Sequence, residues 1–206
     1  IQPIETGIEA KLQKLDGVKA LIFDIYGTLL ISSSGDIQQA NIRVDNMRQA
    51  LAESGFLFLE QEAEAQEEVA KGLLDKFIAL IARHHQLERV RGVLYPEVDI
   101  RKVWEDLVNY AQEKKLLRRT DGYDPLKLHF IFELLSNRVW PMPGMREIVR
   151  HFHDRDYLLG IVSNAQFYTP LLLEFLSATE LDKMGFDMKC ISWSYEIGCG
   201  KPDPRI

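Results

Sequence analysis

A short apolar run from Ala20 to Phe23 ends at Asp24, and Gly27 follows shortly afterwards. A run of this length, bounded by polar residues and glycine, is typical of a buried strand. Open α/β sheets place their chemistry at the carboxyl ends of their strands, which is where Asp24 would lie. Gly27 permits a tight turn whose backbone amides can face an anion. The segment therefore predicts an α/β fold with a nucleophilic aspartate, although a buried strand ending in an aspartate turn has the same pattern.

Two later segments place polar residues after a strand in the same way. The run from Leu158 to Val162 predicts a second buried strand, and it ends in Ser163 and Asn164. A weaker run from Cys190 to Trp193 is followed by a Gly-Cys-Gly-Lys-Pro segment that contains Lys201. A carboxylate, a hydroxyl and a lysine at successive strand ends are the groups needed to attack and stabilise a phosphoryl or similar group.

With these residues in view, the chain resembles the haloacid dehalogenase-like hydrolase superfamily. Three motifs of that superfamily appear in the right order, as Asp24-Ile25-Tyr26-Gly27-Thr28, Ser163-Asn164 and Lys201-Pro202. The resemblance implies a Rossmann-like parallel-sheet core with an inserted all-helical cap domain. It also implies a hydrolase that acts on a small molecule through a covalent aspartyl intermediate. The region from Ile31 to Trp140 matches no particular member.

The resemblance also implies roles for individual residues. Asp24 would be the nucleophile, and Lys201 would offset negative charge at the reacting centre. Ser163 and the amide of Asn164 would donate hydrogen bonds to a developing anion. The residues expected to contact the substrate or to support the first motif are Ile25, Tyr26, Thr28 and Asn164.

Tyr26 departs from the pattern of the superfamily's phosphatases, which carry a second aspartate there as a general acid. Tyrosine, with an ordinary pKa near 10, is a poor acid at neutral pH. The 2-haloacid dehalogenase branch has tyrosine at this position, because a departing halide needs no proton. A haloacid would need a cation for its carboxylate, for which Arg43 and Arg48 are candidates, although both are more typical of solvated helix residues. Ala165 also stands where glycine is expected in the dehalogenases.

Three functions therefore remain open. Mg²⁺-dependent hydrolysis of a phosphate ester is slightly favoured, because most of the superfamily acts on phosphate. Dehalogenation without a metal is the alternative that Tyr26 favours. The third possibility is a non-catalytic interaction protein of the same fold.

For a phosphatase, Mg²⁺ is the expected cofactor, with Asp24 and the backbone carbonyl of Tyr26 as ligands. The superfamily's acidic fourth motif should follow Lys201 by some tens of residues, whereas the sequence stops at Ile206. We therefore expect the chain to be part of a longer protein, in which later core strands follow.

The expected domains are core at 1–31, cap at 32–140 and core at 141–206. Apolar residues at helical spacing predict cap helices over 37–53, 60–91, 97–115 and from Asp124-Pro125 to about 137. Breaker-rich crossings at 32–35 and 140–144 suit a lid that rocks over the strand ends, and equally a subdomain fixed to the core. Two helices near 145–152 and 171–176 should cover the sheet.

Composition narrows the class of partner. A net charge of −6 disfavours nucleic acid and acidic membrane surfaces, and no apolar stretch approaches the length of a membrane helix. Cys190 and Cys199 have no metal-ligand spacing and suit a reducing cytoplasm. We therefore expect a cytoplasmic protein with a small-molecule substrate and no nucleic-acid or membrane partner. The oligomeric state and the substrate itself leave no signal in the sequence.

Overall fold

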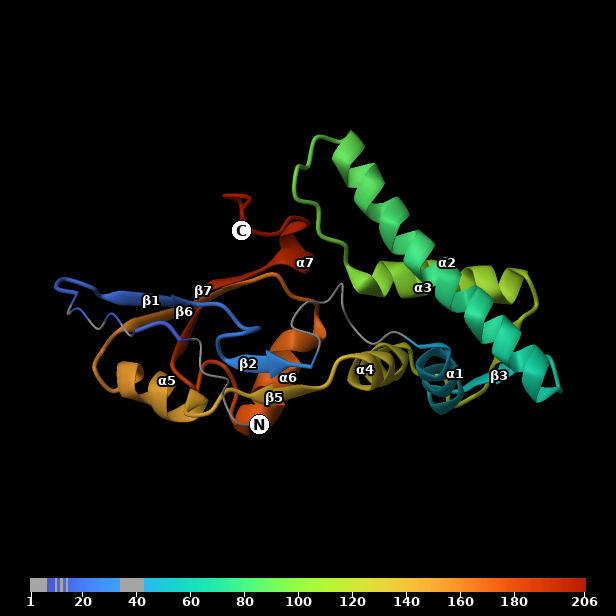
Figure 1. The fold of residues 1–206 in the computed structure, drawn as a ribbon, viewed down its shortest axis with the longest axis horizontal. Helices are drawn as coiled ribbons and strands as arrows, with labels where there is room; N and C mark the ends of the chain where they lie inside the picture. The colour runs from blue at the N-terminus through green and yellow to red at the C-terminus, as the bar shows by residue number, and fades with distance from the viewer. Residues whose placement is uncertain (1–6, 10, 12, 14, 34–42) are drawn as a thin grey trace.

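The computed structural model of the chain describes residues 7–9, 11, 13, 15–33 and 43–206. This part of the chain forms an α/β core and a mostly helical cap, which is inserted after the first strand of the core sheet (Figure 1). The predicted crossing at 34–35 and the predicted start of a cap helix at 37–42 lie outside the described residues.

Within the residues that the structure describes, the core sheet has three parallel strands. They are β1 (Ala20–Phe23), β6 (Leu158–Ser163) and β7 (Phe186–Trp193), and β6 lies between the other two. Phe23 pairs with Ile161, and Ser163 pairs with Trp193, so the three strands end at one edge of the sheet. This register confirms the α/β fold and brings the segments that follow each strand to the same edge.

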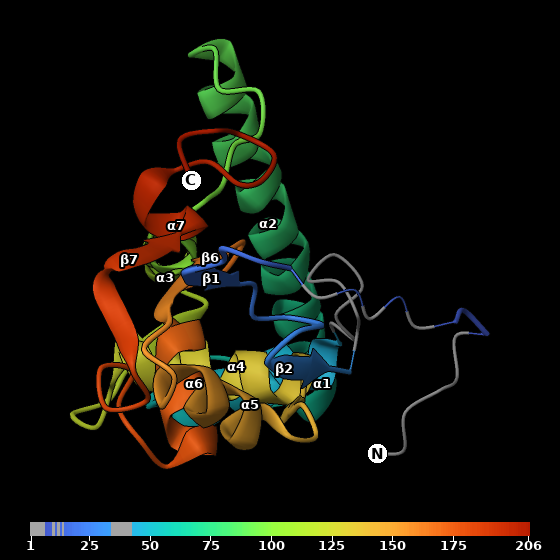
Figure 2. The same ribbon diagram turned by 90° about the vertical axis from the view of Figure 1, so that its left-hand side faces the viewer.

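Two helices cover one face of the sheet. They are α5 (Met145–His153) and α6 (Tyr168–Ser177), and they lie on the same side of β1 and β6 (Figure 2). Met145, Val149 and Leu173 are buried in the cluster that packs against Leu159 and Ile161 of the sheet. Both helices agree with the amphipathic segments predicted from the sequence.

β1 differs from the buried strand that its apolar run predicts. It lies at an edge of the sheet, and its side chains alternate between the two faces. Leu21 and Phe23 pack into the core, and the Phe23 ring meets Phe186 edge-on at 5.9 Å between centroids. Ile22 points the other way and is 57% exposed. Among the described residues, helices cover β1 on one face only, so the apolar run is half buried.

The two chain crossings between core and cap pair with each other. β2 (Leu30–Ser32) and β5 (Val139–Pro141) form an antiparallel pair in which Leu30 lies opposite Pro141. The chain therefore leaves the core and returns to it at neighbouring points, as the breaker-rich crossings indicate.

The cap contains four helices among the described residues, close to the predicted ranges. They are α1 (Val44–Glu53), α2 (Ala63–Val90), α3 (Ile100–Glu113) and α4 (Pro125–Ser136). Asp124 caps α4 as predicted, because its Oδ1 accepts hydrogen bonds from the amides of Leu126 and Lys127 at 2.9 and 3.3 Å. A short antiparallel pair, β3 (Phe56–Phe58) and β4 (Leu117–Arg119), joins these helices, and helical spacing did not predict it.

The cap has a hydrophobic core of its own. The rings of Phe77, Trp104 and Phe132 form its centre, with centroid distances of 4.5 to 5.3 Å. This cluster is separate from the one beneath the sheet. A third cluster around Phe167 and Tyr168 packs against Phe130 of the cap, so cap and core are also in apolar contact. Within the described ranges, no helix is both long and apolar enough to cross a membrane.

Two leucines on the same cap helix should differ in their contribution to stability. Leu73 is fully buried on α2, whereas Leu87 is 47% exposed on it. We expect Leu73→Ala to lower the free energy of unfolding by about 2–5 kcal/mol, because it leaves a cavity. Leu87→Ala should change it by less than about 0.5 kcal/mol. Urea unfolding followed by circular dichroism measures both, and equal losses would contradict this packing.

Candidate active site

Asp24 lies directly after β1, and three donors fix its carboxylate. Oδ1 accepts hydrogen bonds from the amide of Ile25 at 2.8 Å and from the hydroxyl of Ser163 at 2.9 Å. Oδ2 lies 2.7 Å from Nζ of Lys201. The Asp24 side chain is nevertheless 42% exposed. The structure thus brings together the predicted catalytic residues around a carboxylate that is held in place and accessible.

Ser163 ends β6 and is fully buried. The sequence predicts that its hydroxyl donates to a developing anion. In this structure the hydroxyl donates to Asp24, and a serine hydroxyl has only one proton to donate. Ser163 therefore orients the carboxylate here, and donation to an anion would require the hydroxyl to rotate.

Lys201 is tied to the loop that follows β6. Its amide donates to Oδ1 of Asn164 at 2.7 Å, and its Nζ donates to the carbonyl of Val162 at 3.3 Å. Gly200 packs so closely on Asn164 that an added Cβ would lie 2.9 Å from the same Oδ1. Asn164 thus links the second and third motifs, and a glycine is needed beside it.

The turn after Asp24 differs from the predicted anion cradle. Gly27 has a positive φ of 80°, which explains why glycine is needed there. Its amide, however, donates to the carbonyl of Leu30 at 2.8 Å. The amides of Thr28 and Leu29 donate to the carbonyl of Ile25 at 3.1 and 2.8 Å. These three amides close the turn, so the prediction that the backbone amides of the turn face an anion is wrong for Gly27, Thr28 and Leu29 in this structure.

The other predicted substrate-contacting residues occupy different environments. The Ile25 side chain is fully buried in the core cluster and does not reach the site. Its amide does reach the site, where it donates to the Asp24 carboxylate. Thr28 is exposed and lines a surface hollow with Met142, Met145 and other residues of the α5 start. That hollow does not include Asp24, Ser163 or Lys201. Direct contact with substrate is therefore a stronger prediction for Asn164 than for Thr28.

Tyr26 turns its hydroxyl toward α6 rather than into solvent. The hydroxyl is 2.9 Å from Oγ1 of Thr169. Burial raises the pKa of Tyr26 well above its ordinary value, and the nearby charge of Glu133 raises it further. Tyr26 therefore keeps its proton at neutral pH and is poorly suited to act as a general acid.

Glu133 was not among the predicted site residues. Burial raises its pKa above the ordinary value, although hydrogen bonds with Tyr168 and Asn137 oppose the shift. The sequence does not indicate that this glutamate of a cap helix is buried beside Tyr26 and Tyr168. These two tyrosines belong to the core, so they meet Glu133 only in the folded chain, where the cap packs on the core.

The described residues do not complete a magnesium site by themselves. No group of three or more histidine, cysteine, aspartate or glutamate side chains gathers within them to hold a metal ion. Asp24 directly follows β1, and Ser163 and Lys201 already contact its carboxylate oxygens. The predicted ligand set of Asp24 and the Tyr26 carbonyl would supply two oxygen ligands, whereas Mg²⁺ prefers an octahedral set.

The two candidate cations for a haloacid carboxylate lie on or beside α1. Arg48 is exposed and lies 3.5 Å from Asp45, one turn away on the same helix. Arg43 is exposed immediately before that helix. Both arginines fit the description of solvated helix residues.

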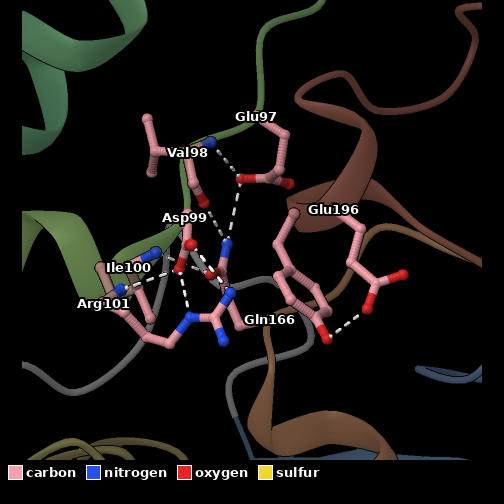
Figure 3. Close-up of polar contacts among 8 residues, drawn as sticks. Glu97, Val98, Asp99, Ile100, Arg101, Gln166 and Glu196 are labelled. Carbon is pink, nitrogen blue, oxygen red and sulfur yellow. Dashed lines mark hydrogen bonds and ion pairs between the residues drawn. The ribbon is translucent and has the colours of Figure 1, made fainter.

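Cap residues also reach the strand ends. Figure 3 shows the segment from Glu97 to Arg101 of the cap against Gln166, which follows β6. Gln166 is 5% exposed and bonds to the cap through both ends of its amide group. Neither Glu97 nor Gln166 was a predicted site residue, because each belongs to a segment without a motif.

Comparison with known proteins identifies the family. The model of the haloacid dehalogenase-like hydrolases matches residues 18–206. The chain therefore belongs to the haloacid dehalogenase-like hydrolases. A search of curated proteins gave no match.

Several solved structures are similar to this chain at low identity. One, described as a dehalogenase, is 18% identical with a TM-score of 0.40, over 93% of this chain and 69% of its own. The L-2-haloacid dehalogenase from Xanthobacter autotrophicus is 17% identical with a TM-score of 0.39, over 91% and 61%. A predicted phosphoglycolate phosphatase from Haemophilus somnus 129pt is 14% identical with a TM-score of 0.38, over 91% and 67%. The chain thus spans 61–69% of the length of these structures.

The contact between Gly200 and Asn164 gives a test of the site that spares the fold. The added methyl group of Gly200→Ala can be accommodated by moving the Asn164 side chain, which breaks its bond to the Lys201 amide. Misplacing a catalytic group by about 1 Å can cost a hundredfold in rate. We expect hydrolase turnover to fall by about ten- to a hundredfold, while urea unfolding changes little.

Gly72→Ala is the matched control, because an added Cβ there meets nothing within 4 Å. It lies within α2, where alanine is favoured over glycine by about 1 kcal/mol, so this variant should be fully active. Wild-type turnover in Gly200→Ala would contradict the role given to Asn164.

Proposed function

We propose that this hydrolase acts on a small molecule through a covalent intermediate on Asp24. Of the two candidate substrate classes, phosphate esters and 2-haloacids, we propose phosphate esters. The observation that supports this most is the carboxylate of Asp24. It is held by Ser163 at 2.9 Å and Lys201 at 2.7 Å and is still accessible to a ligand. A fixed, exposed carboxylate beside a cation is suited to nucleophilic catalysis.

In the proposed reaction, an Asp24 oxygen attacks the phosphorus atom and the bond to the leaving oxygen breaks. The products of this step are an aspartyl phosphate and the departing alkoxide, which takes its proton from water. Water then attacks the phosphorus, which releases inorganic phosphate and restores the carboxylate. Lys201 stabilises the negative charge in both steps, because its ammonium group lies at the reacting carboxylate.

Mg²⁺ is the cofactor that we propose for this reaction, where it would neutralise charge on the phosphoryl oxygens. The ligands that the described residues offer are the Asp24 carboxylate and the Tyr26 carbonyl. Further oxygen ligands would have to come from the substrate, water or residues beyond those described.

The environment of Tyr26 favours a second candidate, hydrolytic dehalogenation. Here an Asp24 oxygen attacks the carbon that carries the halogen, and the halide leaves with the bonding electrons. Water then hydrolyses the resulting ester, which yields a 2-hydroxy acid and restores Asp24. This route needs no leaving-group acid, which agrees with a Tyr26 hydroxyl bonded to Thr169.

We also propose a small molecule as the partner and the cytoplasm as the location. The net charge of −6 supports a substrate other than nucleic acid or an acidic membrane surface. Cys190 and Cys199 are both free, which supports a reducing compartment.

Asp24→Asn tests the nucleophile. Asparagine keeps the shape of the side chain but is a far weaker nucleophile, so turnover should fall at least about a thousandfold. Asp75→Asn, an exposed aspartate on α2, is the matched control and should retain full activity. Both variants are assayed for phosphate release from an ester panel and for halide release from 2-haloacids. Undiminished turnover in Asp24→Asn would rule out the nucleophile assignment.

The same assays separate the candidate functions. Phosphate release that chelator abolishes and Mg²⁺ restores would support the phosphatase, and metal-independent halide release would support the dehalogenase. No turnover on either panel, with a folded protein, would support a non-catalytic interaction protein of the same fold and would overturn the proposed hydrolysis.

Tyr26→Phe tests whether the reaction uses this hydroxyl as an acid. Because the raised pKa keeps the hydroxyl protonated and its partner is Thr169, we expect turnover within about threefold of wild type between pH 6 and 9. The lost hydrogen bond should reduce the free energy of unfolding by about 1 kcal/mol. A loss of about 10²–10⁴ in rate would instead identify Tyr26 as a general acid.

A further inference from the structure

The loop between α2 and α3 contacts the core segment that precedes Lys201. Pro96 and Cys199 form an antiparallel bridge. The amide of Gly200 donates to the carbonyl of Tyr95 at 2.9 Å, and the amide of Glu97 donates to the carbonyl of Gly198 at 3.1 Å. A stretch of cap backbone is thus paired with the backbone that positions Lys201.

Gln166 binds the same cap loop from the other side. Its Oε1 accepts from the amide of Ile100 at 3.0 Å, and its Nε2 donates to the carbonyl of Val98 at 2.8 Å (Figure 3). Nε2 also lies 3.2 Å from Oε1 of Glu97. Because Gln166 follows the second motif by two residues, the loop after β6 and the cap loop are fixed to each other.

The carboxylate of Glu97 connects these two sets of contacts. Its Oε1 accepts from the amide of Val98 at 3.0 Å, and its Oε2 accepts from the hydroxyl of Ser194 at 3.0 Å. Ser194 is fully buried just after β7, and its Oγ accepts from the amide of Ala165 at 2.9 Å. A single cap carboxylate therefore reaches Ala165 through Ser194.

Resting on the proposed function, we propose that Glu97 is a positioning residue for catalysis. It acts through Ser194 and Gln166 on the loop after β6, and through its amide on the segment before Lys201. The two loops meet where Asn164 accepts from the amide of Lys201. Glu97 thereby fixes the relative positions of Ser163 and Lys201, which hold Asp24, without touching Asp24 itself.

This arrangement changes the expected behaviour of the cap. A lid that rocks as one rigid body would have to break the contacts of Tyr95 and Glu97 with the core, together with those of Gln166. The contacts instead fix residues 95–100 to the core, so that opening moves the helices around this loop rather than the loop itself. The α2–α3 loop then stays in place beside the active site when the cap opens.

The test compares Glu97→Ala with Glu97→Gln. Alanine removes the link to Ser194, so we expect kcat to fall about ten- to a hundredfold with KM changed less than about threefold. Glutamine can still accept from the Val98 amide and can donate to Oγ of Ser194, whose proton has the Ala165 carbonyl as a second acceptor at 3.2 Å. Glu97→Gln should therefore recover most of the lost kcat. Glu105→Gln, an exposed position on α3, is the control and should match wild type.

Amide hydrogen exchange gives a readout that does not depend on turnover. In Glu97→Ala, peptides covering 163–166 and 198–201 should exchange faster than in wild type, while β1 and the cap helices keep their protection. Ser194→Ala interrupts the same link from the core side and should give the same change at 163–166, which serves if Glu97→Ala does not fold.

The outcomes distinguish the two proposals. A wild-type chain without turnover on either substrate panel overturns the proposed function, and exchange alone then decides the role of Glu97. Unchanged exchange in both Glu97→Ala and Ser194→Ala, or a wild-type kcat in a folded Glu97→Ala, overturns the positioning role. An equal loss of kcat in Glu97→Gln and Glu97→Ala would overturn the proposed hydrogen-bond link.

Discussion

The parallel alignment of the core strands is the constraint on which the contact between Asp24 and Lys201 depends. The two residues come from opposite ends of the described chain, yet Oδ2 and Nζ lie 2.7 Å apart. This distance is reached because β1, β6 and β7 are parallel and end at one edge of the sheet. The chain also leaves the core and returns to it at neighbouring points, because β2 pairs with β5. The insertion of a cap is therefore compatible with an intact site.

The cap has two features with opposite effects on its freedom to move: a hydrophobic core of its own and hydrogen bonds to the core domain. Its own aromatic cluster allows it to pack as a separate unit, which suits a lid. Glu97 and the backbone of Tyr95, however, are bonded to the segments that carry Ala165 and Gly200. An enzyme that gains order at its catalytic loops from its cap gives up part of the cap's freedom to open. In this structure the cap is attached to the core at two places. One is the loop between α2 and α3, and the other is the pair of crossings formed by β2 and β5.

Much of this organisation was predictable from the sequence because its causes are local. A short apolar run that ends in a polar residue predicts a strand and places that residue at a strand end, which gave Asp24 and Ser163. Lys201 was found from the Gly-Cys-Gly-Lys-Pro segment that follows β7, although α7 (Ser194–Ile197) lies between the strand and this lysine. Helical spacing gave the cap helices within a few residues, and the Asp-Pro pair at Asp124 gave the start of α4. In each case the pattern and the structure that it predicts lie within the same few residues.

The remaining features depend on partners that are far away along the chain, and no local pattern encodes them. Gln166 bonds to residues 66 to 69 positions earlier, and Ser194 to a glutamate 97 positions earlier. The apolar run of β1 predicted burial on both faces, but burial is decided by which elements cover each face of the sheet. Likewise, glycine at position 27 predicted a tight turn correctly, while the direction of its amide depended on the carbonyl of Leu30. Local sequence thus indicates which groups reach the strand ends, and the docked cap determines how firmly they are held there.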